Sequence, residues 1–91
     1  MKIYNWYIVE DCLFNEKMIV QYYGREEGFE CLVCGKGNNA YCFNRYYDQD
    51  QYETFSYGKE HMPKIIKDLG KSDKQIFDTK ENIEMFLKEV K

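Results

Sequence analysis

The spacing of the apolar residues changes near residue 60, and this change constrains the fold more than any other feature of the chain. Before that point, short runs of aromatic and β-branched residues alternate with turn-forming residues roughly every 8–12 positions, which is typical of antiparallel strands. After it, apolar residues recur at the i, i+3, i+4 and i+7 spacing of amphipathic helices. We therefore expect residues 1–91 to form a single α+β domain, strand-rich over 1–58 and helical over 60–91.

Five segments are predicted as strands, at residues 3–10, 18–23, 29–34, 40–47 and 52–57. The segments between them are turn-like, above all residues 25–28 (REEG) and 35–39 (GKGNN), where glycine and asparagine favour tight turns. Consecutive pairing of such strands predicts an antiparallel β-meander. The first segment is apolar at both odd and even positions, which predicts a strand that is covered on both faces.

The last third of the chain predicts two amphipathic helices, packed together on one face of the sheet. Gly70 would end the first helix, whose apolar face would consist of Met62, Ile65, Ile66 and Leu69. Asp78 or Thr79 would cap the second helix, whose apolar face would consist of Ile83, Phe86, Leu87 and Val90. Because each helix has one face to bury, a single shared layer is the simplest arrangement.

The charge distribution argues against several classes of partner. The chain has 13 basic and 16 acidic residues, a net charge of −3, and no cluster of lysine and arginine. Binding to duplex DNA or to an anionic membrane surface is therefore not expected. No apolar run approaches the ~20 residues that span a bilayer, and residues 1–6 lack the features of a signal peptide. We expect a cytoplasmic protein whose four cysteines are reduced or metal-bound.

The run CLVCG at residues 31–35 admits three interpretations. In a zinc knuckle, two thiolates on a tight turn bind one tetrahedral ion, and the glycine relieves strain in the turn. Zinc needs four ligands, and an all-thiolate site would consist of Cys12, Cys31, Cys34 and Cys42. A redox pair would need a helix after the motif, whereas a turn and a strand-like segment follow it. The simplest interpretation is that these cysteines are small buried apolar side chains and that no cofactor is bound.

Catalytic residues are not evident in the chain. His61 is the only histidine, and no serine or cysteine lies in a recognisable nucleophile turn, so no catalytic triad is predicted. The GKG at residues 35–37 lacks both the spacing and the following helix of a phosphate-binding loop. We therefore expect a protein that is not an enzyme.

Aromatic residues are frequent, with nine Tyr, six Phe and one Trp. Because strands direct successive side chains to opposite faces, the neighbours Tyr22-Tyr23 and Tyr46-Tyr47 must each place one ring on each face of the sheet. Two helices would cover one face, so tyrosines would remain on the other, where such side chains suit a binding surface. The predicted partner-binding residues are Tyr46, Tyr47, Asp48, Asp50, Tyr52 and Glu53.

These features predict a small non-enzymatic protein-binding module whose acidic, tyrosine-rich sheet region binds a basic surface of another protein. The profile suits an inhibitor of phage or mobile-element origin, of the anti-CRISPR type, by analogy with that class of proteins. One alternative is a zinc-stabilised domain that uses the knuckle at Cys31 and Cys34. Another is a protein that binds or sequesters a nucleotide or other small molecule against its aromatic rings.

Overall fold

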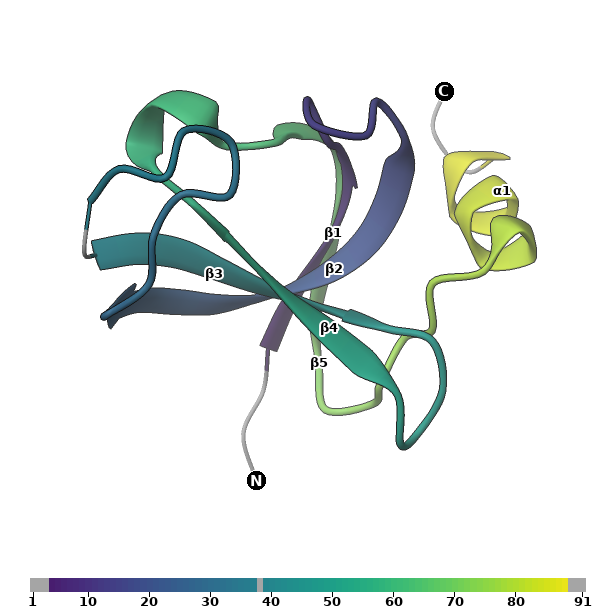
Figure 1. The fold of residues 1–91 in the computed structure, drawn as a ribbon. Coiled ribbons are helices and arrows are strands. Elements are labelled where there is room, and N and C mark those ends of the chain that lie inside the picture. The colour runs from purple at the N-terminus through teal and green to yellow at the C-terminus, as the bar shows by residue number, and fades with distance from the viewer. Residues whose placement is uncertain (1–3, 38, 89–91) are drawn as a thin grey trace.

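The computed structural model describes residues 4–37 and 39–88. These residues form one five-stranded antiparallel sheet, a short 3-10 turn and one α-helix (Figure 1). The strand order is β4-β3-β2-β1-β5, so the last strand returns to pair with the first. In chain order the elements are β1 (Tyr4–Glu10), β2 (Lys17–Glu27), β3 (Asn39–Tyr46), β4 (Tyr52–Tyr57), the 3-10 turn η1 (Lys59–His61), β5 (Lys64–Ser72) and α1 (Lys80–Lys88).

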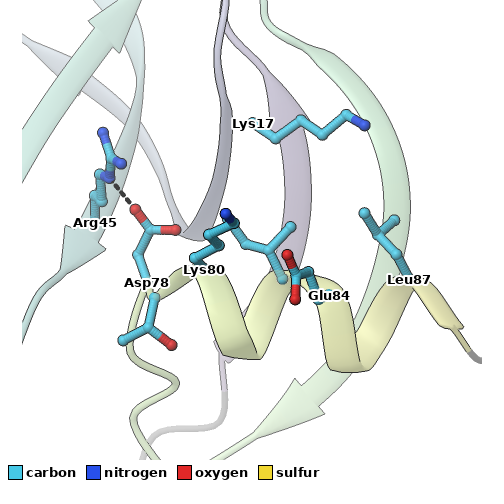
Figure 2. A pocket seen from close by; sticks show the side chains of 8 residues that line it. Lys17, Arg45, Asp78, Lys80, Glu84 and Leu87 are labelled. Atoms are coloured by element: carbon cyan, nitrogen blue, oxygen red, sulfur yellow. Dashed lines mark hydrogen bonds and ion pairs between the residues drawn. The ribbon is translucent and has the colours of Figure 1, made fainter.

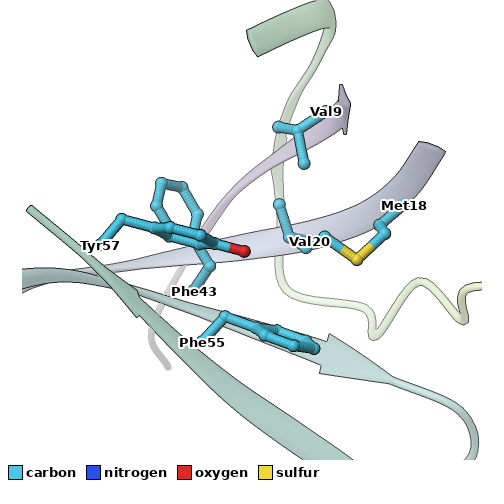
Figure 3. Packing of buried hydrophobic residues seen from close by; sticks show 6 residues of the cluster. All are labelled: Val9, Met18, Val20, Phe43, Phe55 and Tyr57. Carbon is cyan, nitrogen blue, oxygen red and sulfur yellow. The ribbon is translucent and has the colours of Figure 1, made fainter. Parts of the chain in front are cut away.

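Two apolar clusters lie on opposite faces of this sheet. The sheet coils so strongly that β1 and β5 run across the direction of β3 and β4 (Figure 1). The inner cluster lies between these two halves and consists of Val9, Met18, Val20, Phe43, Phe55 and Tyr57 (Figure 3). The outer cluster consists of Trp6, Ile8 and Ile19, and it is covered by Ile83, Phe86 and Leu87 of α1. Both faces of β1 are therefore buried, which confirms the prediction from its apolar pattern.

The predicted strand at residues 29–34 is wrong, and so is the predicted turn at residues 25–28. β2 continues as far as Glu27 because a bulge near Gly24 accommodates one extra residue against β3. Gly24 has a φ of 114° there, which favours glycine, so this glycine bends the strand without ending it. Residues 29–37 then form a loop that includes the predicted knuckle.

The predicted helix with Met62, Ile65, Ile66 and Leu69 on one face is also wrong, because these residues belong to or precede β5. Two register shifts against β1 leave Ile66 and Leu69 without a direct partner. In a regular strand, side chains two positions apart lie on the same face, and a bulge adds one residue to this spacing. Ile66 and Leu69, which are three positions apart, therefore both reach the outer cluster. Ile65 is instead 54% exposed. The described residues therefore contain one α-helix in place of the two predicted on one face of the sheet.

The predicted second helix is confirmed as α1, although its predicted residue Val90 lies outside the described residues. Thr79 caps it, since the Thr79 hydroxyl accepts a hydrogen bond of 3.1 Å from the Asn82 N–H. Asp78, the other predicted cap, has a different role. Its carboxylate accepts hydrogen bonds from the Ile19 N–H at 2.9 Å and from the Arg45 guanidinium (Figure 2).

Candidate functional site

Backbone hydrogen bonds shape the turn at residues 31–35, which carries two of the cysteines. The Gly35 N–H donates to the Cys31 carbonyl over 2.7 Å, and Gly35 has a φ of 71°. This left-handed conformation suits glycine and lets the chain reverse directly after the second cysteine. The turn is also joined to β4, because the Leu32 N–H donates to the Ser56 carbonyl over 3.0 Å. The cysteines thus lie on a tethered tight turn.

His61 reaches this turn from η1. Its Nδ1 atom lies 3.6 Å from the Sγ atom of Cys31, which is 30 residues earlier in the chain. One ligand atom from each of Cys31, Cys34 and His61 lies within 4.8 Å of the other two. Cys31 is buried, His61 is partly buried and Cys34 is exposed. Two thiols and an imidazole, which are common zinc ligands, therefore converge at one place.

The Cys31 sulfur is surrounded by hydrogen-bond donors. Burial on its own raises the pKa of this thiol, but four hydrogen bonds oppose that effect. The donors are the backbone amides of Gly58, Cys34 and Val33 and the Cys34 thiol, and with them the pKa of Cys31 is lowered to about 6. The turn therefore stabilises the thiolate, which is the form of cysteine that binds metals and attacks electrophiles.

The other two cysteines lie in different surroundings. Cys12 is exposed in the β1–β2 turn, and its Sγ atom lies 3.9 Å from the carbonyl oxygen of His61. Cys42 is buried in β3, where its thiol donates to the Ala40 carbonyl at 3.7 Å. Its side chain lies on the face of β3 opposite the inner cluster, since its neighbour Phe43 belongs to that cluster. The structure thus brings Cys12, Cys31 and Cys34 toward His61, and it leaves Cys42 elsewhere.

A second candidate site, the tyrosine cleft, lies on the outer face of the sheet. It has a volume of about 560 Å³ and is lined by residues of β1 to β4 and of the adjoining loops. At its floor, the Asn44 amide donates to the buried Gln21 side chain at 3.3 Å and accepts from the Thr54 hydroxyl at 2.8 Å. The carbonyl of the Asn44 amide is thus already paired with the Thr54 hydroxyl. The side-chain amides of Gln49 and Gln75 also line the cleft.

Two pairs of stacked rings stand beside this floor. The rings of Tyr4 and Tyr23 have centroids 6.4 Å apart, and those of Tyr46 and Tyr52 have centroids 5.1 Å apart. Tyr23 and Tyr52 are 48% and 56% exposed, so each pair has one ring that reaches into solvent. Tyr22, the neighbour of Tyr23, packs against the inner cluster, which confirms that adjacent tyrosines lie on opposite faces.

The predicted partner-binding residues divide between two faces. Tyr46 and Tyr52 line the cleft. Tyr47 lies outside it, where its hydroxyl donates to Glu53 at 3.3 Å and the Arg45 guanidinium lies 5.1 Å from its ring centroid. Both remaining residues, Asp48 and Asp50, are exposed in the turn between β3 and β4. The Asp48 carboxylate closes that turn by accepting two backbone N–H groups at 2.8 Å.

Sequence reasoning missed parts of both sites. It did not assign Tyr4 and Tyr23 to the same surface as Tyr46, because that requires the register of β1, β2 and β3. The sequence did indicate that residues 42, 44 and 46 share one face of a strand, because side chains alternate along it, and all three line the cleft. It set aside His61 as a lone histidine, since only the tertiary fold brings η1 over the cysteine turn.

A third cleft, of about 400 Å³, lies between α1 and the sheet (Figure 2). Arg45 and Asp78 line it and are paired with one another, and Lys17, Lys80 and Glu84 stand at its rim. Because the charges of Arg45 and Asp78 are already paired with one another, these two residues join the helix to the sheet and are not free to hold a ligand.

No helix within residues 4–37 and 39–88 is long and apolar enough to cross a membrane. No protein-family model matches the chain, and no curated protein or solved structure matches it.

Proposed function

We propose that this protein is a small non-enzymatic binding module whose tyrosine cleft binds an exposed, basic segment of another protein. The observation that supports this most directly is the pair of tyrosine stacks beside an amide floor. Tyrosine offers a large rigid contact area at low conformational cost and keeps a polar hydroxyl at its tip, which is why it is enriched at protein interfaces. The side-chain amides of Gln49 and Gln75, which line the cleft, suit the backbone of an extended segment.

The charges at the cleft favour a basic ligand. Glu26 is the one charged residue among the described residues that line the cleft. Asp50 is exposed in the nearby β3–β4 turn, which adds a second carboxylate close to Tyr52. The guanidinium of Arg45, the single base of β3, is paired with Asp78 and with Glu16 at 2.9 Å. An approaching lysine or arginine would therefore meet acidic groups and aromatic faces, both of which attract cations.

The same charges argue against a nucleotide. Aromatic rings stack on bases, but sites of this kind hold the phosphates with lysine or arginine. No basic residue lines the cleft within the part of the chain that the structure describes. If the cleft binds a small molecule instead, the tyrosine rings and the lack of a basic residue among the described residues of its lining favour an uncharged planar one. The analogy with anti-CRISPR-type inhibitors of phage or mobile-element origin stays a prediction.

The proposal is tested by comparing the wild type with Tyr52→Ala and Tyr47→Ala. Both substitutions remove a partly exposed tyrosine from the same hairpin, but only Tyr52 lines the cleft. Each immobilised protein is exposed to lysate of the native host, and the retained proteins are quantified by mass spectrometry. We expect one protein to be retained by the wild type and by Tyr47→Ala and to be lost from Tyr52→Ala.

The retained protein is then purified, and its binding to the three variants is measured by calorimetry. A loss of affinity confined to Tyr52→Ala supports the cleft, and increased salt should weaken binding if basic residues enter it. Equal binding by all three variants would contradict the proposal. A thermal shift with an uncharged aromatic metabolite, absent in Tyr52→Ala, would favour the small-molecule alternative instead.

A further inference from the structure

We infer that Cys12, Cys31, Cys34 and His61 bind a zinc ion, as a Cys3His site separate from the tyrosine cleft. The site rests on three convergent ligands and on Cys12, whose sulfur lies 3.9 Å from the backbone carbonyl oxygen of His61. It replaces Cys42 of the all-thiolate set predicted from the sequence with His61. The inference does not depend on the proposed binding function, because the two sites share no residue.

The separations agree with tetrahedral coordination. Zinc lies about 2.3 Å from a cysteine sulfur and about 2.0–2.1 Å from a histidine nitrogen. At a tetrahedral angle these bond lengths place sulfur and nitrogen about 3.5–3.6 Å apart. The measured distance between Cys31 Sγ and His61 Nδ1 is 3.6 Å. The edge of a zinc tetrahedron is therefore already present between these two residues.

The surroundings of Cys31 are those of a ligating thiolate. Backbone amides of Val33, Cys34 and Gly58 donate hydrogen bonds to its sulfur. In zinc knuckles such amides surround the sulfur and orient it toward the metal. A Cβ added at Gly58 would make an ordinary contact with the Cys31 sulfur at 3.7 Å, so Gly58, the residue after β4, lies close against this ligand. The Cys31 side chain is also buried.

Cys12 is positioned to complete the site. Its sulfur already lies beside the carbonyl of His61, and its exposed side chain can change rotamer without moving the backbone. Asp11 and Tyr57 lie next to it, and both are fully buried. The Asp11 carboxylate accepts the Leu13 N–H through Oδ1 at 2.9 Å, and it faces the Tyr57 hydroxyl.

The consequence of this arrangement is structural. One ion would join the β1–β2 turn, the cysteine turn and η1, three segments that the strand ladders of the sheet do not connect. Four protein ligands leave no open position for a substrate, so the metal would stabilise the fold rather than catalyse a reaction. A structural site of this kind suits a domain that is too small to depend on its apolar core alone.

The inference is tested on the full chain, purified without chelator and under reducing conditions. Zinc is measured by mass spectrometry, its affinity is measured by competition with a chromogenic chelator, and Co²⁺ is used as a spectroscopic probe. We expect a single zinc per chain and the visible absorption of tetrahedral Co²⁺ bound by thiolates. Cys34→Ser and His61→Ala should lose most of this affinity, whereas Cys42→Ser should retain it as the matched control.

Cys12→Ser tests the fourth ligand without disturbing the core, because this side chain is exposed. We expect a loss of zinc affinity of at least about 10-fold and a changed Co²⁺ spectrum. Unchanged affinity and spectrum would overturn the assignment of Cys12. Absence of zinc from the wild type, even after Zn²⁺ is added to reduced protein, would overturn the whole site. A Cys31–Cys34 disulfide without metal uptake would instead identify a redox pair. Tyr52→Ala should bind zinc normally, so failure of the cleft and failure of the metal site are distinguishable.

Discussion

The guanidinium of Arg45 donates a hydrogen bond to the buried carboxylate of Asp78, which lies 33 residues later in the chain (Figure 2). Arg45 is near the end of β3, and Asp78 lies just before the cap of α1. The Asp78 carboxylate also accepts the Ile19 N–H of β2, and its own N–H donates to the Tyr46 carbonyl of β3. The ladder between these strands runs only to the pair Gln21 and Asn44, so Asp78 replaces it beyond that point.

We expect Asp78→Ala to be among the most destabilising substitutions in the chain. It would leave the Arg45 guanidinium, whose side chain is 14% exposed, without its buried partner. It would also leave the Ile19 N–H unpaired. Removing one partner of a buried ion pair costs about 3–5 kcal/mol in unfolding free energy.

Urea denaturation measures this cost, and Glu16→Ala is the control. Glu16 also pairs with Arg45, but its side chain is 48% exposed, so its loss should cost less than about 1 kcal/mol. Equal effects of the two substitutions would show that burial of the Asp78 pair does not matter.

Two neighbouring isoleucines distinguish strand β5 from the helix predicted there. Ile66 packs against the outer cluster, whereas Ile65 is 54% exposed. We expect Ile66→Thr to cost about 1–2 kcal/mol, because it places a hydroxyl against apolar side chains. Ile65→Thr should change stability by less than about 0.5 kcal/mol, since threonine also favours strands. A helix with both residues on its apolar face would make the two losses similar in a thermal denaturation measurement.

Two glycines near the cysteine turn should respond differently to alanine. Gly35 has a φ of 71°, and a Cβ there would meet no atom within 4 Å, so the cost is that of the backbone alone. We expect Gly35→Ala to lower the unfolding free energy by about 1–2 kcal/mol. Gly58 has a φ of −69°, and an added Cβ would make ordinary contact with Cys31 at 3.5 Å. Gly58→Ala should therefore be neutral or slightly stabilising, and a larger loss there than at Gly35 would contradict this backbone argument.

Removal of the proposed zinc ion should loosen one part of the protein rather than all of it. Hydrogen–deuterium exchange is compared before and after treatment with a chelator. We expect faster exchange of the Leu32 amide, which is bonded to Ser56, and of the His61 amide in η1. The Ile83 amide of α1 should keep its protection, because the outer cluster does not involve the metal ligands. Uniform loss of protection would mean that the metal holds the whole fold, and no change would mean that it holds none of it.

Local patterns predicted much of the sheet. β4 has the predicted bounds Tyr52–Tyr57, β1 and β3 each lie within a residue of their predictions, and α1 begins directly after its predicted cap Thr79. In these segments the apolar residues recur with an uninterrupted strand or helix spacing, so the buried face of each can be identified without knowing which elements pack against it. The same alternation correctly separated Tyr22 from Tyr23.

The errors arose where glycine or a bulge changed the local period. Gly24 and Gly70 were predicted to end a strand and a helix, yet both have positive φ inside strands, at 114° and 82°. Ile66 and Leu69 are three positions apart in the sequence, and they point to the same face of β5 because of its bulges. The same three-residue spacing places two side chains on one face of a helix. A spacing of three residues does not distinguish a bulged strand from a helix, because a bulge is defined by the pairing with the partner strand.

The sequence by itself identified most of the antiparallel strands and the capped helix α1, and it indicated that the tyrosines divide between two faces. Those properties depend on side chains within a few residues of one another. The tertiary structure alone decided that β5 pairs with β1, that Asp78 joins Arg45, and that His61 meets Cys31. Each of these contacts joins residues at least 30 positions apart, or depends on which strand edge is left unpaired, and no local pattern carries that information.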